Sequence, residues 1–183
     1  MTPTLDTCAY CPRLCRHVCP VAVATARESA TPTAMASMAL LHRLGKIDAA
    51  TALAGTALCS GCGACERHCH HHVPFPTLLR SFRAELGVLP PEAPAIALAP
   101  GLPAELPRFR TCAEGADGTD GAPACCGHRD GFPEAQPEAA RMMAEAVTRH
   151  FAGQRFSCAS SSCARWLAQH GAQVVAPTDT PFA

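Results

Sequence analysis

The sequence predicts a mainly α protein: a helical first part followed by a smaller α/β part. Three features carry this prediction: two dense cysteine runs near the start, apolar residues at helical spacing between them, and alternating helix and strand patterns after residue 107. The segment 87–107 is rich in proline, which interrupts both helices and sheets. We therefore expect a domain at 1–86, a linker at 87–107 and a second domain at 108–183.

Apolar periodicity places the helices of the first part. A helix is expected from residue 33 up to Gly45, and Asp48 is expected to cap a second helix that ends near Ala57. Pro76 is expected in the first turn of a third helix, where proline is tolerated. The apolar stripes of these helices are expected to face the core: Met35, Met38, Leu41, Leu44, Leu78, Leu79, Phe82 and Leu86.

The second part shows an alternating pattern. Residues 137–151 and 163–170 read as helices, the latter closed by Gly171, while 155–158 and 173–177 read as short strands. This order predicts a βαβ-like unit.

Composition excludes several classes of function. Fifteen basic residues balance fifteen acidic ones, and no basic stripe is present, so nucleic acid is not an expected partner. No apolar stretch reaches the roughly 18 residues of a membrane span. The N-terminus does not resemble a signal peptide, so the thirteen cysteines are read as metal ligands in a cytoplasmic protein rather than as a disulfide scaffold.

The two cysteine runs have the spacing of iron–sulfur ligands. CSGCGACERHC follows the bacterial pattern C-x2-C-x2-C-x3-C, and CAYCPRLCRHVCP has one extra residue but keeps the final proline. Zinc sites are usually built from cysteine pairs, which fits these runs poorly. In the bacterial pattern the fourth cysteine binds the other cluster. If that rule holds, two 4Fe-4S clusters are bound, one by Cys8, Cys11, Cys15 and Cys69 and the other by Cys59, Cys62, Cys65 and Cys19. Gly61 and Gly63 fit a tight turn close to a cluster.

Three consecutive histidines, His70, His71 and His72, follow the second run. They are read as a polar turn beside a cluster, and a metal site of their own is the less favoured alternative. Their titration near neutral pH would also tune the potential of the adjacent cluster.

Residues 5–88 resemble the helical iron–sulfur subunits that carry two 4Fe-4S clusters. These include subunits of heterodisulfide reductase, glycolate oxidase and anaerobic glycerol-3-phosphate dehydrogenase. The resemblance is carried by CSGCGACERHCHHHVPFPTLLRSFRAEL, with Val73, Pro74, Leu78, Leu79 and Arg83 at the motif positions. His70 replaces the usual proline. The resemblance implies a helical two-cluster ferredoxin domain.

The stretch CCGHRDGFPEA resembles the cysteine-rich CCG domain of the same family. That domain has two repeats, each ending in C-x2-C, whereas this chain has one CC-G and a Cys158-x4-Cys163 pair. The resemblance therefore implies a partial half-domain, which either stays empty or binds a third iron–sulfur cluster. The candidate ligands of the third site are Cys112, Cys125, Cys126, Cys158 and Cys163.

The sequence carries neither a dinucleotide fingerprint nor a phosphate-binding loop. We therefore expect an electron-transfer protein with two 4Fe-4S clusters, and the resemblance implies a flavoprotein or dehydrogenase subunit as its partner. One alternative is a catalytic, disulfide-reductase-like subunit with a further cluster in the CCG-like part. The other is a zinc-binding interaction module.

Overall fold

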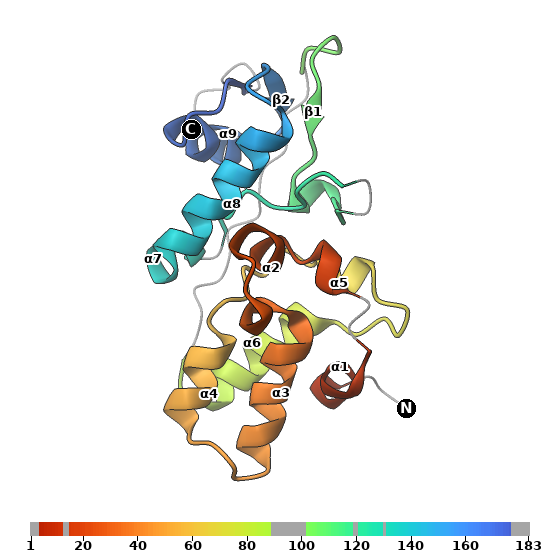
Figure 1. Cartoon of the computed structure of the whole chain (residues 1–183), viewed down its shortest axis with the longest axis vertical. Coiled ribbons are helices and arrows are strands. Elements are labelled where there is room, and N and C mark those ends of the chain that lie inside the picture. Colours follow the sequence, from red (N-terminus) through yellow and green to blue (C-terminus); the bar gives the residue numbers. More distant parts are fainter. Residues whose placement is uncertain (1–3, 13–14, 89–101, 119–120, 130, 177–183) are drawn as a thin grey trace, which may run out of the picture.

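The computed structural model describes residues 4–12, 15–88, 102–118, 121–129 and 131–176. Helices dominate this part of the chain, and a small parallel sheet lies near its C-terminal end, which confirms the predicted fold class (Figure 1). The helices are α1 (Leu5–Tyr10), α2 (Pro20–Thr25), α3 (Pro32–Arg43), α4 (Ala49–Thr56), α5 (Ala64–Arg67), α6 (Phe75–Glu85), α7 (Phe132–Ala135), α8 (Pro137–His150) and α9 (Ser161–Gln169). Short 3-10 turns lie at Arg16–Val18, Glu28–Ala30 and Cys112–Glu114. The strands are β1 (Arg108–Phe109), β2 (Phe156–Cys158) and β3 (Val174–Val175).

Local signals set the ends of α3 and α4 as predicted. The helix α3 ends just before Gly45, which has a φ of 67° that few other residues adopt without strain. Asp48 caps α4, because its Oδ1 accepts a hydrogen bond of 2.7 Å from the backbone N–H of Thr51.

The prediction that every residue of the apolar stripe on α3 faces the core is wrong for two leucines. Leu41 is 38% exposed and Leu44 is 59% exposed, while Met35 and the small residues Ala36 and Ala39 are buried. The cause is close helix packing, since α1 and α4 both lie against α3. Small side chains allow such an approach better than leucine does.

The predicted βαβ unit is confirmed. Strands β2 and β3 pair in parallel and α9 connects them. The strand β1 was not predicted; it pairs in parallel with β2 and gives the order β1-β2-β3. Phe109 and Phe156 from these strands pack with Val147 of α8 and Leu167 of α9 in one buried cluster.

The two parts of the chain share a buried core. The helix α2 packs against α8, as Figure 1 shows near the middle of the molecule. Val21 and Ala64 of the first part lie in the same buried cluster as Ala140 and Met143 of α8. Residues 89–101 of the predicted linker lie outside the described residues. The second part is thus packed directly on the cysteine-bearing first part.

Candidate metal centres and a cysteine network

The first predicted ligand group consists of Cys8, Cys11, Cys15 and Cys69. Cys8 lies in α1, Cys11 caps its end, and Cys69 follows α5, which brings the second run to the first. Burial, together with the charges of Cys15, Cys69 and Cys11, raises the pKa of the Cys8 thiol to about 12. Four thiolates this close repel one another. A bound iron cluster would remove the protons and balance the charge, so this donor set fits a cluster.

The second predicted group consists of Cys59, Cys62, Cys65 and Cys19. Cys19 caps the start of α2 and so comes from the first run. Burial, and then the charge of Cys62, raises the pKa of Cys19 to about 12, with a further contribution from Cys59. The pKa of Cys65 is also raised, by burial and then by the charges of Cys59, Cys62 and Cys19. The structure therefore brings together the two crossed sets that the spacing predicts.

The turn that begins α5 is tight at both of the expected glycines. Gly61 and Gly63 have φ of 70° and 74°, in the left-handed region. A Cβ on Gly63 would lie 2.9 Å from Nη1 of Arg67. Backbone conformation and the Arg67 side chain therefore account for glycine here.

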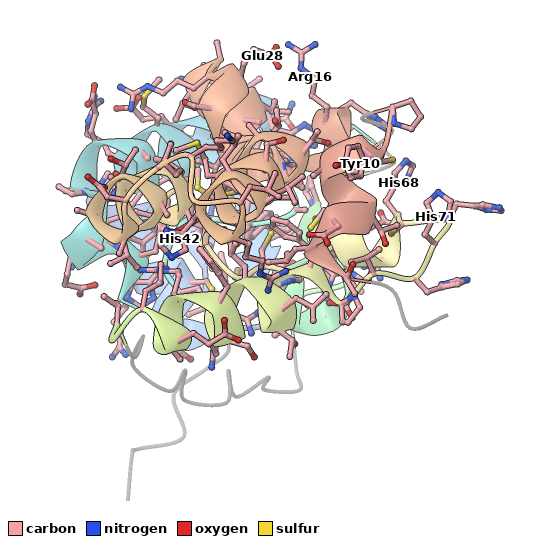
Figure 2. All side chains as sticks on the ribbon, turned by 90° about the horizontal axis from the view of Figure 1, so that it is seen from below. Tyr10, Arg16, Glu28, His42, His68 and His71 are labelled. Atoms are coloured by element: carbon pink, nitrogen blue, oxygen red, sulfur yellow. The ribbon has the colours of Figure 1, made fainter. Side chains whose placement is uncertain are left out.

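His70, His71 and His72 are exposed, and the rings of His70 and His71 lie 5.9 Å apart, edge to face. Sequence reasoning missed a second histidine contact. His17 of the first run and His68 of the second have ring centroids 4.7 Å apart, also edge to face. Each of these two histidines comes shortly before the fourth cysteine of its run. This shared position was the signal in the sequence from which the contact could have been predicted. Figure 2 shows His68 and His71 on the same side of the molecule as the exposed Tyr10.

The five cysteines of the candidate third site converge, although no disulfide joins them. The Cys125 thiol is in hydrogen-bond contact with those of Cys112 and Cys126. Cys126 in turn contacts Cys163, which contacts Cys158. The five thiols thus form one continuous network of buried sulfur atoms.

This network also reaches the first part of the chain, which the sequence did not indicate. The Cys125 thiol forms a hydrogen bond with Cys62, and this bond is the main reason why the pKa of Cys62 is lowered to about 6. Cys62 belongs to the second predicted ligand group. The network therefore begins at an expected cluster ligand.

Two thiols of the network have lowered pKa values. Hydrogen bonds from Cys126 and Cys158 lower the pKa of Cys163 to about 3, and a hydrogen bond from the Ser160 side chain contributes. The pKa of Cys112 is also lowered, first by its hydrogen bond with Cys125 and then by Arg129, whose Nη1 lies 3.5 Å from the Cys112 sulfur. Thiolates are the reactive form of cysteine.

Packing fixes the position of the vicinal pair. The indole Nε1 of Trp166 donates a hydrogen bond of 2.9 Å to the carbonyl oxygen of Cys126. Gly127 follows with a φ of 87° and lies directly against Ala140 of α8. The turn that carries both cysteines is therefore clamped between α8 and α9.

Among the residues that the structure describes, no group of three or more His, Cys, Asp and Glu side chains could hold a metal ion. Within the same residues, no helix has the length and apolar character needed to cross a membrane.

Residues 4–73 match the family model of the 4Fe-4S dicluster domain. No curated protein and no solved structure matches the chain significantly. The matched range contains both cysteine runs and all eight predicted ligands. Residues 4–73 are therefore similar to an iron–sulfur domain that binds 4Fe-4S clusters, and this similarity supports a role in electron transfer.

Proposed function

We propose that this chain transfers electrons through two 4Fe-4S clusters, one held by Cys8, Cys11, Cys15 and Cys69 and the other by Cys59, Cys62, Cys65 and Cys19. The observation that carries the proposal is the crossed grouping of the thiols. The charge of Cys69, from the second run, raises the pKa of Cys8, from the first run. The charge of Cys62, from the second run, raises the pKa of Cys19, from the first run. Each cluster would join two segments that lie far apart in the sequence, and so would stabilise the fold as well.

The two ligand groups are neighbours. The charge of Cys15, from the first group, contributes to the raised pKa of Cys65, from the second. Two adjacent one-electron centres suit a short electron path, in which the cofactor does the chemistry and the protein sets its potential. By its resemblance to the helical two-cluster subunits, the chain would serve a flavoprotein or dehydrogenase partner.

The test is the metal content of protein purified without oxygen, combined with electron paramagnetic resonance of the reduced form. We expect about eight iron and eight sulfide per chain and the signal of two interacting clusters. The crossed ligand sets are tested by Cys69→Ser and Cys19→Ser, each of which should disturb a different cluster signal. Cys158→Ser is the matched control and should leave both signals unchanged. Zinc in place of iron, in protein made with iron and sulfide available, would contradict the proposal.

A further inference from the structure

A cavity of about 520 Å³ lies at the junction of the two parts of the chain. Residues around α5 and the first turns of α6 line one side of it, and the turn at Cys112 together with Arg129 lines the other. Its volume is in the range of cavities that bind small organic molecules. Because each part of the chain supplies one wall, the cavity is complete only when the two parts pack together.

Positively charged side chains dominate the lining of this cavity. Three arginines, Arg67, Arg80 and Arg129, contribute to it, against one carboxylate, that of Glu66. Within the lining, Glu66 can balance only one of the three positive charges. A cavity lined mainly by one sign of charge raises the local concentration of the opposite sign. The lining therefore favours an anionic ligand.

The arginines come from both walls of the cavity. Arg67 and Arg80 lie on α5 and α6 of the first part of the chain, and Arg129 lies in the second part. A guanidinium binds a carboxylate through paired, charge-assisted hydrogen bonds. A molecule with two carboxylates can therefore engage an arginine on each wall at the same time, whereas a monocarboxylate engages one wall.

Hydrogen bonds within the protein already position two of the three guanidinium groups. Nη2 of Arg67 donates to the carbonyl oxygens of Cys62 and Ala116, which are neutral and so fix the guanidinium without cancelling its charge. Nη1 of Arg129 donates a hydrogen bond of 3.5 Å to the sulfur of Cys112. Groups that are positioned before a ligand arrives lose less conformational entropy when they bind it.

We propose that this cavity binds a small dicarboxylate, with one carboxylate held by the arginines of the first part and the other by Arg129. The ligand bridges the two parts of the chain, and it stabilises their packing because it binds only the packed state. Binding involves no covalent change and no electron transfer. The proposal is measured by ligand affinity, and the electron path by iron content and cluster signals, so the two can fail separately.

The test uses the full chain, purified without oxygen, with succinate as the probe at constant ionic strength. We expect one succinate bound per chain in isothermal titration calorimetry, and a melting temperature that rises with the succinate concentration. Succinamide, which has the same carbon chain but no charge, should have neither effect. Acetate should bind more weakly than succinate, because it reaches only one wall.

Variants of the two walls locate the site. Arg80→Gln and Arg129→Gln should each raise the dissociation constant for succinate on the order of threefold to tenfold. Arg129→Gln removes the arginine that the second part contributes, so it should also abolish the preference for succinate over acetate. Arg155→Gln, which removes an exposed arginine outside the cavity lining, should leave both affinities unchanged.

Four results would overturn the proposal. One is the absence of succinate binding to the unaltered chain at millimolar concentration. Another is an affinity for succinate that Arg80→Gln and Arg129→Gln leave unchanged, or that Arg155→Gln lowers equally. A third is tighter binding of inorganic phosphate than of succinate, which would assign the cavity to one compact anion. The fourth is loss of bound iron together with loss of succinate binding in both wall variants, which would show that these arginines act through the clusters.

Discussion

Replacing Gly127 with alanine should destabilise the protein by about 2–5 kcal/mol. Gly127 has a φ of 87°, and holding alanine in the left-handed region costs about 1–2 kcal/mol. The new Cβ would also lie 2.8 Å from the carbonyl oxygen and 3.0 Å from the Cα of Ala140. These atoms belong to the backbone of α8 and cannot swing aside, so overpacking adds about 1–3 kcal/mol.

The matched control is Gly153→Ala. Gly153 also has a positive φ, of 76°, but a Cβ there would meet no atom within 4 Å. Only the conformational cost of about 1–2 kcal/mol should therefore appear. The difference between the two losses in the free energy of unfolding therefore measures the cost of the close approach between Gly127 and α8.

Denaturant unfolding gives both free energies, followed by circular dichroism and by the fluorescence of Trp166, the only tryptophan of the chain. Trp166 is a local probe because its indole binds the carbonyl of Cys126, next to Gly127. Equal destabilisation in Gly127→Ala and Gly153→Ala would show that α8 yields to the added methyl group, and would refute the packing argument.

Three further predictions concern the junction, a helix cap and the metal. Arg67→Ala should lower the free energy of unfolding by about 1–2 kcal/mol. The Arg67 guanidinium donates hydrogen bonds to the carbonyl oxygens of Cys62 and Ala116 and so joins the two parts of the chain. An unchanged free energy in denaturant unfolding would contradict this prediction. The hydrogen bond from Thr51 lowers the pKa of Asp48 below 3.8, so its stabilising contribution is present above pH 3.8 and is lost as the pH falls through the folded-state pKa. Asp48→Asn should flatten this acid limb in a series of melting temperatures against pH, and an unchanged limb would show that other groups cause it. Removing the clusters by oxidation and chelation should reduce the helical circular dichroism signal and expose residues 4–73 to proteolysis. An unchanged melting temperature after this treatment would show that the clusters do not stabilise the fold.

The sequence by itself determined the features that depend on neighbouring residues. The spacing of the cysteines within each run involves only about a dozen consecutive residues, so the two ligand runs were visible without a structure. The end of α3 before Gly45 and the start of α4 at Asp48 were predictable for the same reason, because a left-handed φ and a side-chain cap each involve only a few consecutive residues. The strands of the βαβ unit followed from short apolar runs between turn residues.

The tertiary structure alone decided which surfaces meet. Periodicity could not show that Leu41 and Leu44 would be exposed, since the buried face of α3 depends on how closely α1 and α4 approach it. The strand β1 has only two residues, and it exists because β2 provides its hydrogen-bonding partner. The contact between Cys62 and Cys125, 63 positions apart in the sequence, arises from the packing of α2 against α8. Long-range packing is set by the complementarity of whole surfaces, and no local pattern in the sequence records that complementarity.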